Sequence, residues 1–339
     1  MKAAFAVLAA LLLVLGLGTT AAMATAPPAP AAPATQAAGQ SSSSSQTATS
    51  DATSTQTAPT NYNIPVRVLS PGNDGSVSQS NDSTAASGAL NLNTTDQSIG
   101  QQQAGAGEQA AGQDNSSGQS ADSTATSTQD HATNYNIPVR VLSPGDDGSV
   151  EQSNSSTALS LAANANKTAQ DIGQHQAGGG GGPAVQAAGQ ETSSDQSADS
   201  TATSMQDHAT NYNIPVRVLS EGNGGTVAQS NASTALSVAA NLNKTGQDLG
   251  QHQAGGGYSL APSVQAAGQD ASNEQDATST ATSTQSHATN YNSPVRVLSP
   301  GNDGSVEQSN SSTALSLALN ANALCQSIWQ KQGTLMLRP

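Results

Sequence analysis

The chain has very little of what a conventional hydrophobic core is made of. Aromatic residues make up 2% of its 339 residues, with one Phe and one Trp, and alanine is the commonest apolar residue. Alanine offers little side-chain surface to remove from water. The composition therefore excludes a large aliphatic and aromatic core, and its abundance of Gln, Ser, Thr, Asn and Gly is also typical of disordered segments.

Charge and cysteine are equally scarce. Charged residues account for 9% of the chain, Lys and Arg together number nine, and the formal net charge is −14. So few basic residues, scattered along the chain, cannot form a surface that follows a phosphate backbone, so we expect no nucleic-acid partner. The single cysteine, Cys325, excludes an internal disulfide framework.

The N-terminus has the pattern of an export signal. Met1-Lys2 precedes an apolar run over residues 3–17, and Ala22-Met23-Ala24 matches a cleavage site. We therefore interpret residues 1–24 as a signal peptide and residues 25–35 as an extended Pro/Ala spacer. No later stretch is apolar enough to cross a bilayer, so we expect a protein secreted to the cell surface or extracellular matrix, with no membrane span in the mature chain.

What the chain has in abundance is repetition. A unit of 68 residues occurs four times without insertion or deletion, and a tail of residues 333–339 follows the last copy. The joints between copies are Gly-rich and differ in length. The copies are residues 36–103, 109–176, 186–253 and 265–332. This organisation predicts a repeat architecture in which like residues stack on like.

Along the two arms of each copy, every second residue is almost always the same in all four copies, whereas the residues between them vary. The phase that starts at Val150 is identical in all four copies except for Leu249 and Leu324. Because alternate side chains of a strand point to opposite faces, this pattern predicts long strands with one fixed face. We expect this face to mediate assembly through amide ladders and close Ala/Ser packing. In the second copy the face consists of Gln152, Asn154, Ser156, Ala158, Ser160, Asn164, Asn166, Gln170 and Gln174.

A turn signal separates two arms in each copy, at residues 143–149 in the second. We predict a β-hairpin there, with Val141 opposite Val150, and a nucleus formed by Tyr135, Val139, Val141 and Val150. Each arm of roughly 30 residues would extend about 100 Å. The predicted fold class is therefore an all-β repeat protein, made of long β-hairpin or β-solenoid units or of ribbons stacked as a cross-β fibre.

The candidate chemical residues are few. His131, His208 and His287 share one position of the repeat, and His175 and His252 share another. Neither set has cysteine or an evident carboxylate pattern, so we predict no metal site, although stacked repeats would form a histidine ladder that repels itself below about pH 6.5. We interpret the Asp-Gly sequences after Pro144 as turn chemistry rather than calcium loops. No catalytic constellation or cofactor motif is present, so we expect neither an enzyme nor a cofactor.

Threonine forms runs on the unspecified phase. Thr124, Thr126 and Thr128 alternate in the second copy, and residues 278–284 continue the pattern in the fourth. A flat threonine array could contact ice, wall glycan or another polysaccharide surface, although we favour the simpler interpretation of an exposed strand face rich in a β-former.

The segment Asn134-Tyr-Asn-Ile-Pro-Val-Arg-Val resembles the Asn-rich segment of chaplins, and the cysteine-free Gln/Asn/Ser face resembles that of rodlins. Both are surface proteins of filamentous actinobacteria, and the regular Gln, Asn, Ala and Ser spacing is similar to that of curli subunits. The resemblance implies secreted fibres that coat a cell or spore.

The sequence as a whole therefore predicts a secreted structural protein that self-associates into amyloid-like β-fibres. Two alternatives remain open, a monomeric β-solenoid that binds a surface through its threonine face and a disordered cell-wall spacer. The fourth copy departs from the others at Leu324, Cys325 and Trp329 and ends in an apolar tail, which we interpret as a cap or anchoring end.

Overall fold

The computed structural model describes residues 34–105, 107–177, 184–254 and 263–333. The predicted signal peptide, almost all of the spacer and residues 334–339 lie outside this range. Sixteen β-strands account for the regular structure of the described residues. Among these residues there is no helix long and apolar enough to cross a membrane.

Every repeat has the same four strands. The first contains β1 (Ala34–Thr57), β2 (Thr60–Asn63), β3 (Val66–Val68) and β4 (Val77–Ala104). The second contains β5 (Gly107–Asp130), β6 (Thr133–Asn136), β7 (Val139–Val141) and β8 (Val150–Ala177). The third contains β9 (Ala184–Asp207), β10 (Thr210–Asn213), β11 (Val216–Val218) and β12 (Val227–Ala254). The fourth contains β13 (Ser263–Ser286), β14 (Thr289–Asn292), β15 (Val295–Val297) and β16 (Val306–Gly333).

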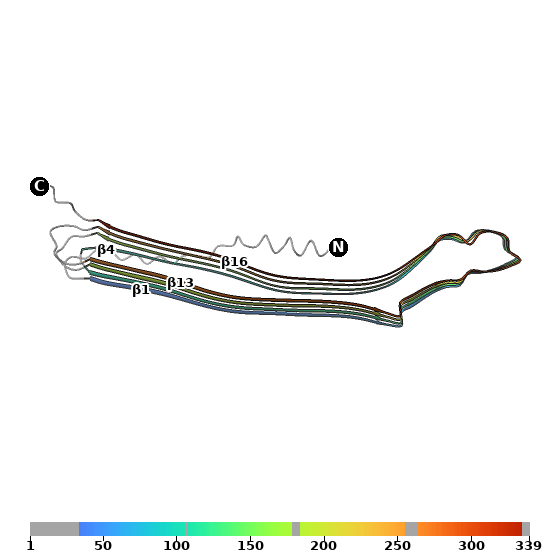
Figure 1. Ribbon diagram of the computed structural model, residues 1–339, viewed down its shortest axis with the longest axis horizontal. Coiled ribbons are helices and arrows are strands. Elements are labelled where there is room, and N and C mark those ends of the chain that lie inside the picture. Colours follow the sequence, from blue (N-terminus) through green and yellow to red (C-terminus); the bar gives the residue numbers. More distant parts are fainter. Residues whose placement is uncertain (1–33, 106, 178–183, 255–262, 334–339) are drawn as a thin grey trace.

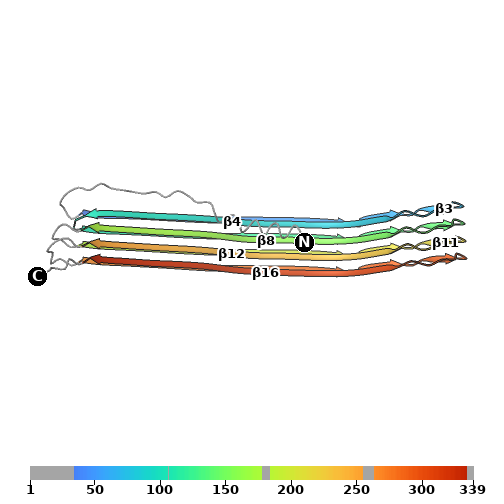
Figure 2. The ribbon, with the colours of Figure 1, turned by 90° about the horizontal axis from the view of Figure 1, so that it is seen from above.

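Each strand pairs in parallel with the equivalent strand of the next repeat. Gln109 of β5 lies beside Gln36 of β1 and Gln186 of β9, and the register holds along the whole of each long strand. The four repeats therefore form four rungs, seen edge-on in Figure 2. This arrangement confirms the predicted all-β repeat architecture, in which each residue stacks on its own equivalent.

The long strands form two sheets that face each other. One sheet has the order β1-β5-β9-β13 and the other β16-β12-β8-β4. Figure 1 shows the two as long layers, joined at one end by the short strands and their loop. Alanines from both sheets meet between the layers, as in the cluster of Ala85, Ala125, Ala158, Ala202 and Ala235.

The predicted hairpin is wrong. Val141 does not pair with Val150, because β7 pairs with β3 and β11 whereas β8 pairs with β4 and β12. The two arms of a repeat face each other through side chains, so each repeat forms a β-arch. Stacking identical repeats satisfies the backbone groups of both arms at once, which leaves no donors or acceptors for a hairpin. Pro138, which lacks an amide hydrogen, lies in the break between β6 and β7.

The alternation changes phase at His131. This residue has a φ of 53°, and His208 and His287 adopt nearly the same conformation. Before this bend the odd-numbered Gln129 points inward, and after it the even-numbered Asn134 and Asn136 do so. Tyr135, Val139 and Val141 of the predicted nucleus are therefore half-exposed on the outside of the arch, and only Val150 is buried.

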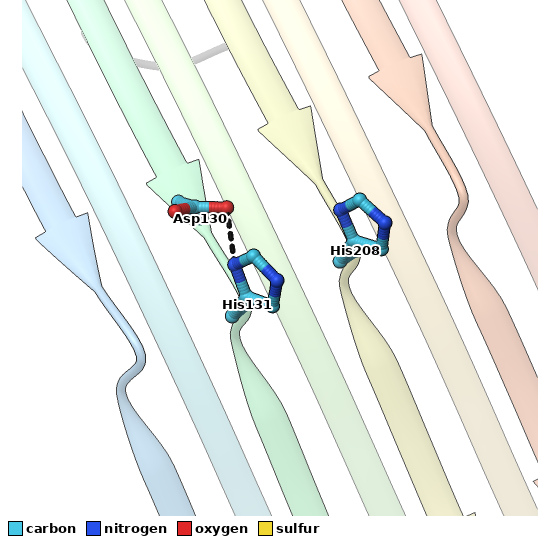
Figure 3. Close-up of side chains that lie close together, drawn as sticks. All are labelled: Asp130, His131 and His208. Carbon is cyan, nitrogen blue, oxygen red and sulfur yellow. Dashed lines mark ion pairs between the residues drawn. The ribbon is translucent and has the colours of Figure 1, made fainter.

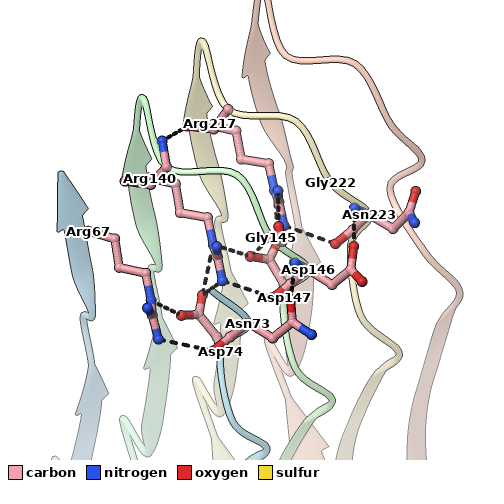
Figure 4. Close-up of polar contacts among 12 residues, drawn as sticks. Arg67, Asn73, Asp74, Arg140, Gly145, Asp146, Asp147, Arg217, Gly222 and Asn223 are labelled. Atoms are coloured by element: carbon pink, nitrogen blue, oxygen red, sulfur yellow. Dashed lines mark hydrogen bonds and ion pairs between the residues drawn. The ribbon is translucent and has the colours of Figure 1, made fainter. Parts of the chain in front are cut away.

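Arginine and aspartate fill the inside of the arch instead (Figure 4). Arg140 binds Asp147 of its own repeat through Nε at 3.1 Å and Asp74 of the preceding repeat through Nη2 at 2.8 Å. Arg217 binds Asp147 from the next rung, again at 2.8 Å. Both guanidinium groups are almost completely buried, and the alternating charges hold the rungs in register.

A column of glycines lets the rungs approach at this point. Gly145 has a φ of 141°, and a Cβ placed on it would lie 2.0 Å from the carbonyl oxygen of Gly72. That carbonyl accepts a hydrogen bond of 2.7 Å from Nη1 of Arg140. Only glycine meets both the conformational and the steric requirement.

Replacing Asp147 should therefore destabilise the fold strongly. The change Asp147→Asn leaves two buried guanidinium groups without their shared counter-charge, and we expect the free energy of unfolding to fall by about 3–5 kcal/mol. Chemical denaturation followed by circular dichroism measures this loss. The matched control is Asp146→Asn, because asparagine occupies that position in the other three repeats. Equal effects of the two changes would contradict the importance of the ladder.

Candidate functional site

The predicted assembly face lies between the two sheets. All nine of its residues in the second repeat are buried, with exposed fractions of 4% or less. Their neighbours on the other phase point outward and are mostly half-exposed. The fixed phase of the sequence is thus the interior of the arch stack, and its role in binding a second chain stays a prediction.

Glutamines form hydrogen-bonded ladders along the stack, with one direction of donation. Nε2 of Gln152 donates to Oε1 of Gln79 in the preceding repeat at 2.8 Å, and Gln229 donates in turn to Gln152 at 2.8 Å. The columns of Gln170 and Gln174 repeat this pattern. In each of these columns the hydrogen bond between glutamine side chains runs from the later repeat to the earlier one, and Nε2 of Gln152 also donates to the backbone carbonyl of Tyr212 in the facing layer.

The asparagines donate in the opposite direction. Nδ2 of Asn81 donates to Oδ1 of Asn154 at 2.9 Å, and Asn154 donates to Asn231 in the following repeat at 3.0 Å. The columns of Asn164 and Asn166 behave in the same way. The two kinds of ladder thus have opposite polarity within one interior.

Serine hydroxyls tie one sheet to the other. Oγ of Ser83 in β4 contacts Oγ of Ser54 in β1 and Oγ of Ser127 in β5, both at 2.9 Å. Ser156 then continues the zigzag from Ser127 at 2.9 Å. Because each serine of one sheet lies between two of the other, the sheets are offset along the stack.

The two ends of the stack are open. Every residue of β16 is exposed, and the inward residues of β1 at the other end are only half-buried. The inward phase of β16 has the same residues as that of β4 except that Leu324 replaces Thr95. The end rungs therefore present the interior pattern without a partner rung. Trp329 and Cys325 lie on the outward phase of β16 and are also exposed.

The histidines form the columns expected from stacked repeats. The rings of His131 and His208 are parallel, with centroids 4.7 Å apart, and those of His208 and His287 are 4.5 Å apart. His175 and His252 stack at 4.8 Å.

Carboxylates accompany the first column, although no carboxylate pattern was evident in the sequence for either set of histidines. Nδ1 of His131 lies 2.6 Å from Oδ1 of Asp130 (Figure 3), and Nδ1 of His208 lies 2.9 Å from Oδ1 of Asp207. Desolvation acts to raise the pKa of Asp207, but hydrogen bonds from Ser286, His208 and His287 and the charge of His208 outweigh it and lower that pKa. Asp207 is therefore readily ionised.

The outward faces of the two sheets differ in character. Equivalent positions place Thr53, Thr126, Thr203 and Thr282 side by side across the β1-β5-β9-β13 sheet. The opposite face, on β16-β12-β8-β4, carries a patch of aliphatic side chains that was not predicted from the sequence. It consists of Leu90, Leu92, Leu159, Leu161, Leu236, Val238, Leu242, Leu315, Leu317 and Leu319.

In-register stacking also brings like charges together. Asp171 lies beside Asp248 in adjacent strands. Partial burial and the charge of Asp248 raise the pKa of Asp171. Similarly, burial and the neighbouring Tyr212 and Tyr62 raise the pKa of Tyr135. In the aspartate column, repulsion between like charges therefore adds to the effect of burial.

An acidic group in an asparagine ladder should be much less tolerated than one outside it. With Asn154→Asp, a carboxylate replaces the amide that donates to Asn231, and we expect a loss of about 3 kcal/mol or more in the free energy of unfolding at pH 7. Burial raises the pKa of the new carboxyl group. The loss should therefore shrink as the pH falls through that raised pKa and the group becomes neutral.

The control is Ser153→Asp, which places the same charge on the outward phase. Its neighbours in the adjacent strands are Ser80 and Ser230, so no carboxylate lies directly beside the new one. Denaturation curves at pH 7 and at pH 4 distinguish the two variants. A pH-independent loss, or an equal loss in both variants, would contradict the buried ladder.

Comparisons with protein-family models, with curated proteins and with solved structures found no match. The resemblance to chaplins, rodlins and curli subunits thus stays an expectation based on the residues quoted for it.

Proposed function

We propose that this protein is a secreted structural protein whose copies stack end to end into β-fibres of the cell surface or extracellular matrix. The observation that carries the proposal is the sequence match between the two open ends of the stack. Apart from Leu324, β16 in the last rung presents the inward residues that β4 in the first rung presents to its successor. An added copy could therefore continue all four sheets in register.

The polarity of the amide ladders supports a head-to-tail arrangement. Internal glutamines donate toward the first repeat and asparagines toward the fourth. By the same pattern, Gln79 of an added copy would donate to Gln308, and Asn310 would donate to Asn81 of the added copy. Donors would face acceptors across the junction in both ladders, whereas a head-to-head contact would oppose like groups.

The arch and the serine zigzag support the same arrangement. Asp303 is 55% exposed, whereas Asp74 and Asp147, each held between two arginines, are 12% and 10% exposed. Arg67 of an added copy would take the position over Asp303 that Arg140 takes over Asp74. Ser312 already contacts Ser283, and Ser54 of the added copy would fall beside it.

The disordered-spacer alternative is less well supported. It predicts that the arms lack partners, yet every residue of β5 pairs with a residue of β1 and of β9. The predicted signal peptide supports secretion and the absence of a recognisable catalytic constellation supports a structural role, both from the sequence.

A lysine placed on the open inward phase should block fibre growth without unfolding the chain. Ala318 is exposed at the end of the stack, but its equivalents Ala162 and Ala239 are completely buried. In Ala318→Lys the added charge can extend into water in a single copy, but would be enclosed between the sheets of a stack. We expect this variant to remain a β-rich monomer in sedimentation and to bind little thioflavin.

The control is Ala323→Lys, on the outward phase of the same strand. Lysine occupies this position in two other repeats, as Lys167 and Lys244. This control and the unmodified mature chain should pellet as dye-binding fibres. Fibres of Ala318→Lys that form as fast as those of the control would contradict the proposed junction.

The threonine columns favour one second candidate, a surface-binding role. The row that contains Thr126 is threonine in all four repeats and faces outward. A regular array of hydroxyl and methyl groups could pack against ice or an insoluble polysaccharide.

Charges placed on this face should weaken such binding. We expect the double change Thr126→Asp and Thr203→Asp to reduce retention on ice or insoluble wall glycan several-fold. The changes Thr157→Asp and Thr234→Asp on the opposite sheet should leave retention unchanged. Cosedimentation with glycan and partition into slowly growing ice provide the measurements, and equal retention of all variants would exclude the threonine face.

A further inference from the structure

Three histidines and two aspartates lie close together at the bend that follows the β1-β5-β9-β13 sheet. His131, His208 and His287 directly follow β5, β9 and β13, and their positive φ angles turn them away from regular alternation. In an unbroken strand each would point to the opposite face from the residue before it. Here Asp130 and His131 instead lie on the same side (Figure 3), and the contact of 2.9 Å between Asp207 and His208 places those two residues in the same way.

The backbone holds this column in place. The amide of His131 donates to the carbonyl oxygen of Asp207 at 2.9 Å, and the amide of His208 donates to that of Ser286 at 2.9 Å. His131 and His208 are therefore fixed at their main chains to the next repeat, whereas the three histidine side chains are between 45% and 70% exposed. The backbone therefore holds the histidines in register, while their exposed side chains can still rotate.

These residues form two overlapping groups of three metal-ligating side chains. One contains Asp130, His131 and His208, and the other contains Asp207, His208 and His287. Within each group one ligand atom from every residue lies within 4.8 Å of the others. Oδ1 of Asp207 lies 2.9 Å from Nδ1 of His208 and 3.5 Å from Nδ1 of His287, so it already contacts both histidines of its group.

We propose that this column is a binding site for a divalent transition metal ion of the zinc type. Two imidazole nitrogens and one carboxylate oxygen are a ligand set that such ions prefer, with water in the fourth position. Tetrahedral bonds of about 2.0–2.1 Å place ligand atoms roughly 3.3 Å apart. The present separations lie on both sides of this value, so rotation of exposed side chains suffices to close the site.

The geometry also sets the stoichiometry. His208 belongs to both groups and contributes one ligand atom to each. Filling one group therefore withdraws a ligand from the other, and we expect one tightly bound ion per chain. All ligands come from a single chain, so the site does not depend on fibre formation.

A second histidine column provides an internal control. His175 and His252 stack just as closely, but neither belongs to a metal-ligating group among the described residues. Glutamine occupies the equivalent position in the first repeat, as Gln102. The double change His175→Gln and His252→Gln therefore removes a stacked histidine pair at a position where the fold accepts the replacement.

The test is calorimetric titration of the mature chain with zinc chloride. The variant His208→Ala should fold, because Ala58 occupies this position in the first repeat with a φ of 49°. We expect zinc affinity to fall by about 100-fold or more in this variant, since loss of even a supporting group costs about 10–100-fold. Zinc should also raise the melting temperature of the unmodified chain and not that of the variant.

The changes in the second column should leave affinity and stoichiometry unchanged. Unchanged binding in His208→Ala, or an equal loss in the His175/His252 variant, would overturn the proposal. If His208→Ala loses its β-spectrum, the double change His131→Ala and His287→Ala removes one histidine from each group and carries the same test. Zinc affinity equal to that of the unmodified chain would then overturn the site.

Discussion

The structure depends on parallel pairing in exact register, which places every residue beside its own equivalent in the next repeat. A residue type is therefore tolerated according to how well it stacks on itself. Amides stack well, because each side chain both donates and accepts, and Gln and Asn accordingly fill the interior. Small residues between them let the two sheets approach, so the interior packs closely with few large apolar groups.

The same constraint explains where charged residues occur and how they are paired. Like charges in one column repel, and partial burial together with the charge of Asp248 raises the pKa of Asp171. Inside the arch the problem is solved by alternation, since each buried arginine lies between carboxylates or backbone carbonyls of two rungs. At the outer bend, aspartates accompany the histidine column. A low charge content is thus a requirement of the architecture as much as a feature of the composition.

Much of the fold could be predicted from the sequence, because in-register stacking requires the same residue at alternate positions of every repeat. The fixed alternate phase predicted strands and a stacked order. The nine residues from Gln152 to Gln174 that it marked as an assembly face are buried between the two sheets of a single chain. The hairpin could not be excluded, because pairing within and between repeats uses the same residues. The change of phase at His131 could not be predicted, because the residue type does not indicate a positive φ. As a consequence, Asn134 is buried inside the arch, whereas Tyr135, which was predicted to be part of the nucleus, lies on the outside. The aliphatic patch was missed because its columns vary between repeats.

The unequal joints acquire a meaning from the in-register fold. Paired residues are 73 positions apart between the first and second repeats, 77 between the second and third, and 79 between the third and fourth. Any insertion within an arm would have to occur in all four copies together, whereas a joint can lengthen alone. Insertions that arise in evolution, or a guest sequence added by design, are therefore best accommodated in the joints that follow β4, β8 and β12.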